Sequence, residues 1–123
     1  MDNIIISGDS MVPTLSHGEK VSVAIKDSYC KGDLICFYLP GTKDFIIHRI
    51  VKIYNDVIYT CGDNRLVPDM GVKKSSISGK VEYKYRDNQH LPIKPFKRFI
   101  LTEIFIQLYI WLRVLRRYSF EGN

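Results

Sequence analysis

The apolar residues of this chain follow a strand-like period over its first two thirds and a helical period near its end. In the first part, short stretches rich in β-branched and aromatic residues are separated by residues that favour turns. Five stretches of this kind predict strands over residues 21–25, 34–38, 45–53, 57–61 and 78–85. The turn-forming segments that precede the first four are Ser16-His17-Gly18, Lys31-Gly32-Asp33, Pro40-Gly41-Thr42 and Asn55-Asp56. The last of these stands directly between two strands, which predicts a tight two-residue hairpin.

The close spacing of these strands, with no helical segment between them, predicts a mostly β domain over residues 1–85. We expect a small, mostly antiparallel sheet or barrel. Residues 86–95 contain Asn88, Pro92 and Pro95 and are predicted to form a linker loop. The chain has 123 residues, of which 46% are hydrophobic, and this is enough for one core of modest size.

After Pro95 the apolar residues recur at the spacing of an α-helix, which predicts an amphipathic helix over residues 96–118. The residues on its apolar side are Ile100, Leu101, Ile104, Phe105, Leu108, Trp111, Leu112 and Leu115. The residues predicted on the other side are Thr102, Glu103, Gln107 and Arg113. The stretch without basic residues, 99–112, carries Glu103 and is shorter than the roughly 20 apolar residues of a spanning helix. We therefore expect no transmembrane span.

Basic residues flank this helix, and its end of the chain carries the whole net charge of +5. Residues 1–79 hold nine basic and nine acidic residues, whereas residues 80–123 hold nine and four. A local basic excess favours an acidic partner, either anionic lipid or nucleic acid, and nucleic acid is the less expected of the two. Tyr109 and Trp111 suit a membrane interface, so one interpretation places residues 96–117 in the plane of a membrane surface. In the other, the apolar side packs on the sheet or on a second copy of the chain.

Two further features argue against a metal site and against an N-terminal signal peptide. Cys30, Cys36 and Cys61 are odd in number and show no metal-ligand spacing with the histidines, so we expect no metal site, no cofactor and mainly buried cysteines. Near the N-terminus, residues 3–7 offer only three consecutive isoleucines, fewer than the roughly 7 to 15 apolar residues of a signal-peptide core. We therefore expect no secretory signal peptide.

The candidate chemistry begins with a serine, Ser10, in the segment Gly8-Asp9-Ser10-Met11-Val12-Pro13-Thr14-Leu15. A serine hydroxyl becomes a good nucleophile when a neighbouring base takes its proton, and a neutral imidazole does this well near pH 7. His48 is the candidate base, because in strand spacing it shares a face with Ile46 and Ile50 and needs a polar partner there. The alternative is a core histidine that donates to a backbone carbonyl.

Two aspartates are candidates for the third role, in which a carboxylate accepts the other imidazole proton. Asp63 lies in Gly62-Asp63-Asn64-Arg65, and Asp69 follows Val67-Pro68. Either can hold His48 in the correct tautomer. Gly-Asp-Asn is also common turn chemistry, so each aspartate alone has a structural explanation.

Together these segments resemble the type I signal peptidases. The residues 8–15 are similar to the Ser-Met-x-Pro-Thr box of that family, Gly32-Asp33-Leu34-Ile35-Cys36-Phe37 to its Gly-Asp-hydrophobic strand, and residues 62–69 to its final acidic box. Ile47-His48-Arg49-Ile50-Val51 resembles the endoplasmic-reticulum and archaeal branch, which has histidine where most bacterial members have lysine. The resemblance covers roughly residues 4–83.

The resemblance implies a serine endopeptidase that hydrolyses leader or signal-type peptides through an acyl-enzyme. It implies Ser10 as nucleophile and His48 as general base, with Asp63 and Asp69 on the two acidic positions. We expect the other residues of the serine box, Gly8, Asp9, Met11 and Pro13, to bind substrate. The substrate is expected to be a peptide or precursor protein that binds as an extended strand along a sheet edge.

The chain departs from the family pattern at two places. Family members usually carry a membrane anchor before the serine box, but nine residues precede Ser10, so we expect membrane association through the C-terminal helix. Some bacterial members have a hydroxyl side chain two residues before the serine, where this chain has Gly8, so the second oxyanion donor is not identified.

Two alternatives remain. A self-cleaving, repressor-like domain would need a lysine base, for which Lys43 and Lys52 are the nearest residues. A non-catalytic β module would bind membrane or RNA through its basic helix.

Overall fold

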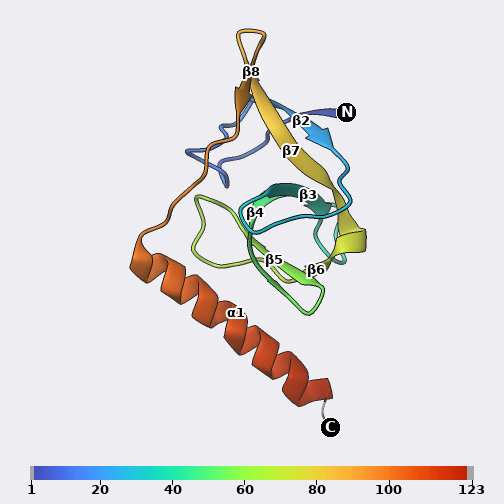
Figure 1. Cartoon of the computed structure of the whole chain (residues 1–123), viewed down its shortest axis with the longest axis vertical. Coiled ribbons are helices and arrows are strands. Elements are labelled where there is room, and N and C mark those ends of the chain that lie inside the picture. The colour runs from blue at the N-terminus through green and yellow to red at the C-terminus, as the bar shows by residue number, and fades with distance from the viewer. Residues whose placement is uncertain (1, 122–123) are drawn as a thin grey trace.

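The computed structural model describes the backbone of residues 2–121 and the side chains of residues 2–117. Its strands are β1 (Asp2–Ile5), β2 (Lys20–Ala24), β3 (Leu34–Tyr38), β4 (Phe45–Tyr54), β5 (Val57–Cys61), β6 (Val72–Lys73), β7 (Ile77–Arg86) and β8 (Gln89–Pro92). A short 3₁₀ turn spans Lys74–Ser76, and α1 spans Ile100–Glu121. The strands form one antiparallel sheet in the order β1-β2-β7-β3-β4-β5-β6, with β8 paired to β7 (Figure 1). The prediction of a mostly β, antiparallel fold with a C-terminal helix is confirmed.

The long strand β7 joins the two halves of the sheet, because it pairs with β2 along most of its length and with β3 near its start. Both pairings contain a register shift, between Ser22 and Val23 and between Cys36 and Phe37. Such irregularities increase the local twist of a sheet. Gly79 stands between them, where a methyl group would lie 2.6 Å from Val23 Cγ1. The bent sheet brings β1 and β4, which are not neighbours in the strand order, to the two sides of one cavity.

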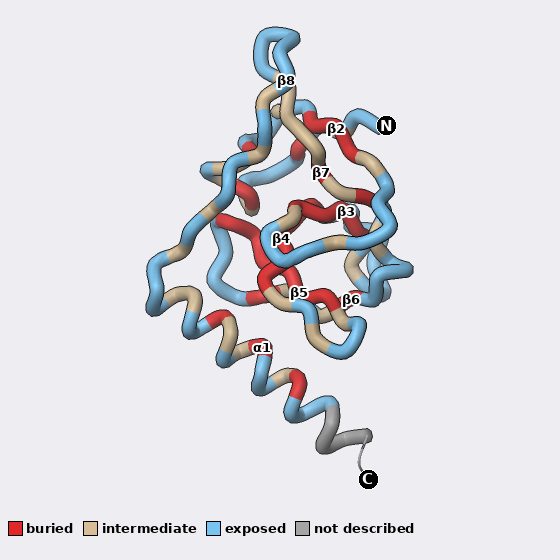
Figure 2. The backbone as a smooth tube through the Cα atoms, in the orientation of Figure 1, coloured by how far each residue is buried: buried red, intermediate tan, exposed pale blue. Residues whose placement is uncertain are grey.

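Three apolar clusters stabilise the fold. The buried residues lie mainly in the strands, with a few more at intervals along α1 (Figure 2). The first cluster anchors the segment that follows β1 against the sheet and contains Ile6, Met11, Leu15, Val21, Val23, Leu34, Cys36, Ile47 and Val81. The second lies between β3, β4, β5 and β6 and contains Ile35, Phe37, Ile50, Ile58 and Val72. The third packs α1 against β4 and β5 and contains Val51, Tyr59, Cys61, Ile106, Ile110 and Val114.

Two tight turns show how well local sequence signals predict the hairpins of this fold. Asn55 and Asp56 have φ angles of 48° and 63° and join β4 to β5, so the predicted two-residue hairpin is confirmed. Asp87 and Asn88 have φ angles of 51° and 63° and form a second hairpin, between β7 and β8. The predicted linker loop 86–95 is therefore wrong over residues 89–92, because the Asp-Asn pair tolerates the left-handed conformation and returns the chain to β7.

The predicted helix is present, but it begins at Ile100, so the predicted start at residue 96 is wrong, and a different side of it is buried. Ile106, Ile110 and Val114, spaced four residues apart, pack on the sheet, and Gln107 Nε2 donates to Val51 O at 3.1 Å. The eight residues predicted to form the apolar side are exposed, for example Leu101 at 78% and Leu108 at 60%. The interpretation in which this apolar side packs on the sheet is therefore wrong: a narrow stripe is enough to cover β4 and β5. The described part of the chain contains no helix that is long and apolar enough to cross a membrane.

Candidate active site

Ser10 is presented by a tight turn that is anchored on both sides. Val12 N donates to Asp9 O at 3.2 Å and Leu15 N to Met11 O at 2.9 Å, so the chain turns immediately after the serine. Met11 and Leu15 are buried in the core, which fixes this turn against the sheet. Gly8, two residues before the serine, has a φ of 86°, a left-handed conformation that favours glycine. Ser10 itself is only half-buried.

His48 lies in the middle of β4 and is held by a carboxylate. Its Nδ1 donates to Asp69 Oδ2 at 2.5 Å, and the ring is buried. The same carboxylate oxygen accepts from Thr60 Oγ1 at 2.8 Å, and Asp69 N donates to Thr60 O at 2.8 Å. This arrangement differs from a core histidine that donates to a backbone carbonyl. With the proton on Nδ1, the other ring nitrogen, Nε2, is an acceptor.

Asp63 has a different partner. Its carboxylate is buried and accepts two hydrogen bonds from Arg49, Nε to Oδ1 and Nη2 to Oδ2, both at 2.9 Å. The Thr14 hydroxyl also donates to it. Arg49 in turn donates to Gly32 O at 2.8 Å and to Lys94 O at 3.3 Å. Of the two aspartates, it is thus Asp69 that contacts His48, while Asp63 forms a buried bidentate ion pair.

The turn formed by residues 62–65 connects the serine segment to the histidine. Asn64 N donates to Ser10 O at 2.9 Å, and Asn64 Nδ2 donates to Asp9 O at 3.1 Å. Arg65 Nη2 forms a 3.0 Å ion pair with Asp9 Oδ1. A methyl group added to Gly62 would lie 2.6 Å from Ser10 O and 3.0 Å from His48 Nε2. Ser10 and His48 therefore both contact the surface of this one turn.

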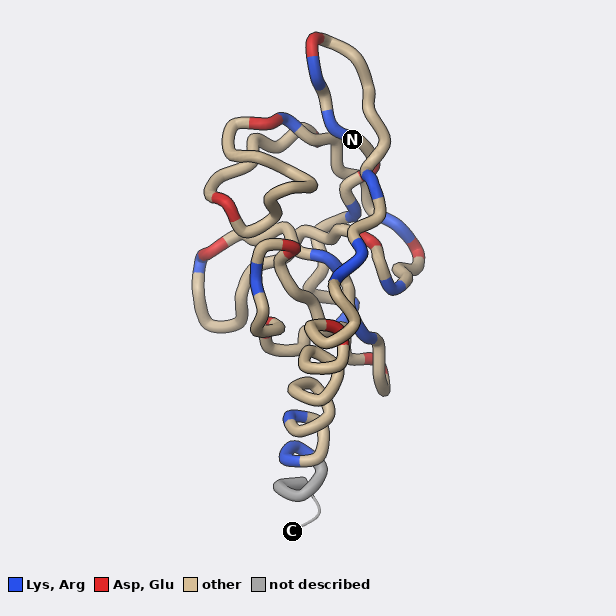
Figure 3. Tube along the Cα trace, turned by 90° about the vertical axis from the view of Figure 1, so that its left-hand side faces the viewer, with Lys and Arg blue, Asp and Glu red and all other residues tan. Residues whose placement is uncertain are grey.

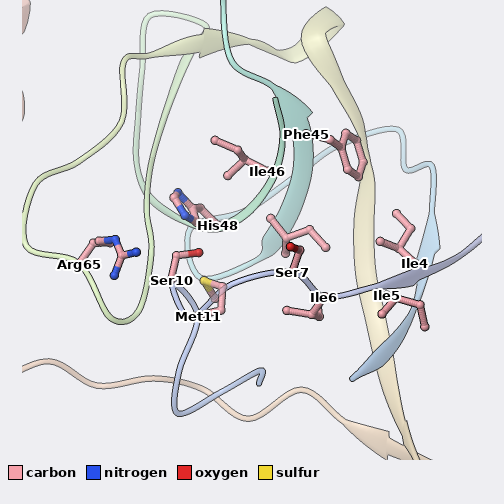
Figure 4. A pocket seen from close by; sticks show the side chains of 11 residues that line it. Ile4, Ile5, Ile6, Ser7, Ser10, Met11, Phe45, Ile46, His48 and Arg65 are labelled. Carbon is pink, nitrogen blue, oxygen red and sulfur yellow. The ribbon is translucent and has the colours of Figure 1, made fainter. Parts of the chain in front are cut away.

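Ser10 and His48 also line the same cavity, whose volume is ≈ 310 Å³ (Figure 4). Its walls are mostly apolar. They come from Ile4 and Ile5 of β1 and the next two residues, Ile6 and Ser7, from Phe45, Ile46 and Ile47 of β4, and from Met11 and Arg65. Among the described residues, no hydrogen bond joins the Ser10 hydroxyl to the His48 ring. Such bonds are often long in a free enzyme and tighten when substrate binds.

The other predicted site residues are spread around the serine turn. Met11 lines the cavity, whereas Gly8, Asp9 and Pro13 do not. Gly8 N donates to His17 Nδ1 at 2.9 Å, and Pro13 is exposed. A role for these residues in substrate binding stays a prediction.

The sequence did not assign roles to four residues that organise the site: Thr14, Arg49, Thr60 and Arg98. Thr14 lies inside the serine box, and Arg49 directly follows His48, so on a strand it points to the opposite face. An arginine buried in this way requires a carboxylate, and this was the available signal for the pairing with Asp63. Thr60 carried no recognisable signal, because its partner Asp69 is brought back to β5 by the irregular segment that follows the turn.

Cys61 directly precedes the turn at residues 62–65. Burial raises the pKa of its thiol to about 11, although the nearby Arg98 opposes this shift. The thiol is therefore neutral near pH 7, and it donates to backbone carbonyls of the following loop. Cys36 is buried too, and burial raises its pKa to about 12. Cys30 is exposed, so two of the three cysteines are buried, in agreement with the expectation of mainly buried cysteines. Within the described residues, no group of three His, Cys, Asp or Glu side chains could hold a metal ion.

The comparison with protein families identifies the class. The profile of the Peptidase S24-like family matches residues 3–82, about two thirds of the chain and the whole segment from β1 through most of β7. The chain belongs to this family, and the match includes Ser10, His48, Asp63 and Asp69.

The comparison with curated proteins finds a relative among the signal peptidases. The chain is 32% identical over 75 residues to the signal peptidase complex catalytic subunit sec11 of Dictyostelium discoideum. The match covers 56% of this chain and 41% of that protein, so the chain spans about two fifths of its length. No solved structure matches the chain. The two matches together support a type I signal peptidase-like family.

The buried ion pair generates a prediction about stability. Asp63→Ala leaves the Arg49 guanidinium buried without its partner, which is expected to lower the free energy of unfolding by about 3 to 5 kcal/mol. Glu82→Ala is the matched control, because Glu82 pairs with Lys26 near the surface and its loss is expected to cost no more than about 1 kcal/mol. Denaturation by urea measures both. Equal losses for the two variants would contradict a special role for the buried pair.

Proposed function

We propose that the chain is a serine endopeptidase that cleaves leader-type peptides, with Ser10 as nucleophile, His48 as general base and Asp69 as the residue that orients the histidine. Membership of a peptidase family supports the reaction class. The observation that carries the assignment is the contact between His48 Nδ1 and Asp69, which leaves Nε2 beside the turn that contacts Ser10.

The proposed reaction follows the chemistry of a catalytic triad. His48 Nε2 accepts the Ser10 proton as Ser10 Oγ attacks the scissile carbonyl carbon. Asp69 stabilises the imidazolium, which then protonates the leaving amine, and an acyl group remains on Ser10. A water molecule, deprotonated by His48, hydrolyses this ester and restores the enzyme. The Ser10 backbone N–H is the proposed first donor to the oxyanion.

Two unpaired strand edges support the binding of an extended peptide. β1 is the terminal strand of the sheet, and β5 pairs with β4 only from Arg49 onward. Within residues 2–121, no strand pairs with the outer edge of β1 or with the β5-side edge of residues 45–48. These edges flank the cavity that contains Ser10 and His48. An added strand could form backbone hydrogen bonds there and place apolar side chains in the cavity.

The self-cleaving alternative requires a lysine beside Ser10. Lys52 Nζ stands 4.7 Å from the centroid of the Trp111 ring, on the side of the sheet that α1 covers. Neither Lys52 nor Lys43 lines the cavity, whereas His48 does. The position of these side chains favours a histidine base over a lysine base.

We also propose that α1 lies on a membrane surface. One stripe of α1 packs on the sheet, and the rest of its apolar surface is exposed. The exposed residues with large apolar side chains are Phe99, Ile100, Leu101, Ile104, Phe105, Leu108, Leu112 and Leu115. Basic residues stand in the linker before α1 and again at 113–117, so charge lies at both ends of the apolar stretch (Figure 3). This arrangement suits anionic lipid headgroups.

Substitutions at the three catalytic positions test the reaction. We expect the wild-type chain to cleave a fluorogenic leader peptide with small residues before the scissile bond. Ser10→Ala and His48→Ala should abolish turnover, and Asp69→Asn should lower kcat by a factor on the order of 10⁴, because the wrong tautomer is favoured. His90→Ala is the control, since His90 stacks on Tyr83 away from the cavity. Equal turnover by wild type and Ser10→Ala would contradict the proposal.

Binding to vesicles tests the location. The double variant Leu101→Glu/Leu108→Glu should bind vesicles of phosphatidylcholine and phosphatidylglycerol at least about 10²-fold more weakly. The transfer of each exposed leucine from water into the bilayer contributes roughly 1.5 to 3 kcal/mol to binding. Ile25→Glu is the matched control, since Ile25 is 83% exposed on the loop after β2. Trp111 is the single tryptophan of the chain, so its fluorescence should shift to the blue on binding. Equal affinity of the double variant and wild type would overturn the membrane assignment.

A further inference from the structure

Arg98, just before α1, holds the backbone of the turn at residues 62–65. Its Nη2 donates to Gly62 O at 2.6 Å, and its Nη1 donates to Arg65 O at 2.8 Å. Gly62 O also accepts from Arg65 N at 2.9 Å, which closes the turn. The two nitrogens of one planar, charged group therefore bind the first and last carbonyls of the turn. A guanidinium is well suited to this, because its donors are fixed relative to one another.

The turn is held from a second side by Arg49. Arg49 pairs with the carboxylate of Asp63, and it also donates to Lys94 O in the linker. The linker is thus tied to the site at two points, Lys94 and Arg98. The guanidinium of Arg98 also stands over the ring of Phe96, with Cζ 5.3 Å from the ring centroid, which limits its other orientations.

A displacement of this turn would also move the proposed catalytic residues, because the turn contacts both of them. Asn64 N donates to Ser10 O, and Gly62 lies against His48 Nε2 so closely that a methyl group would be 3.0 Å from that atom. Arg65 forms the ion pair with Asp9, the neighbour of Ser10. Arg98 itself does not line the cavity, so it would act on these residues through the turn and not on the substrate.

From these contacts, and resting on the function proposed above, we propose that Arg98 is a positioning residue of the Ser10–His48 site. It fixes the turn at residues 62–65 so that Ser10 and His48 keep their relative placement. Because Arg98 is two residues before α1, it also ties the start of the proposed membrane-binding helix to the site.

Kinetics of Arg98 variants test this role. With the fluorogenic leader peptide, Arg98→Ala should lower kcat about 10²-fold, the effect expected of a small misplacement, and should change KM by less than about threefold. Arg98→Lys should not restore kcat, because an ammonium group does not present two fixed donors. Methylguanidinium added to Arg98→Ala should recover part of kcat. Arg86→Ala, which removes an exposed arginine at the end of β7, should match wild type with and without methylguanidinium. Unchanged kcat in Arg98→Ala, or a loss that methylguanidinium does not reduce, would overturn the positioning role.

A second readout does not depend on catalysis. The Asn64 amide donates to Ser10 O, so in Arg98→Ala its hydrogen exchange should become faster, whereas amides of β2 and β7 should keep their wild-type rates. An unchanged Asn64 rate would overturn the proposal for Arg98. If Asn64 exchanges faster but the wild-type chain cleaves no peptide, the result supports the role of Arg98 in fixing the turn and contradicts the proposed peptidase function.

Discussion

The buried ion pair between Arg49 and Asp63 is the contact on which the arrangement of the site depends. Through it, one guanidinium and one carboxylate connect the serine box at Thr14, strand β4, the turn at Gly32, the linker at Lys94 and the turn at residues 62–65. These segments are far apart in sequence, and the ion pair and its hydrogen bonds join them. A buried charge is stable only when it is paired and its hydrogen bonds are satisfied, so each connected segment is constrained to one position.

The two aspartates of the acidic segment have the same side chain but different partners, and therefore different roles in the site. Asp63 faces a guanidinium and a threonine hydroxyl in the interior and ties backbone segments together. Asp69 faces Thr60 and the imidazole of His48, a residue that lines the cavity, and the proposed mechanism needs a carboxylate there that accepts from Nδ1. Arg98 adds a third fixed contact, on the outer side of the same turn. The position of Ser10 relative to His48 therefore depends on two arginines that do not line the cavity.

Local signals in the sequence predicted much of the fold and pointed to the candidate site residues. Contacts between segments that are distant in the sequence could not be predicted. The five strand stretches and the Asn55-Asp56 hairpin follow from β-branched residues and turn chemistry, which act over a few residues. The choice between Asp63 and Asp69 depends on how an irregular segment returns to β5, which no period in the sequence encodes. The side of α1 that is buried was predicted wrongly for a related reason: Ile106, Ile110 and Val114 fit the surface of β4 and β5, although the apolar side opposite them is larger.

The most direct test of the proposed mechanism is the reaction of the folded chain with an alkyl fluorophosphonate, followed by intact mass and peptide mapping. This reagent forms a stable adduct with a serine that a neighbouring base activates. We expect one adduct per chain, on Ser10, and no adduct under the same conditions when His48 is replaced by alanine. An unmodified chain, or an adduct that forms equally well without His48, would contradict the assignment of Ser10 and His48 as a catalytic pair.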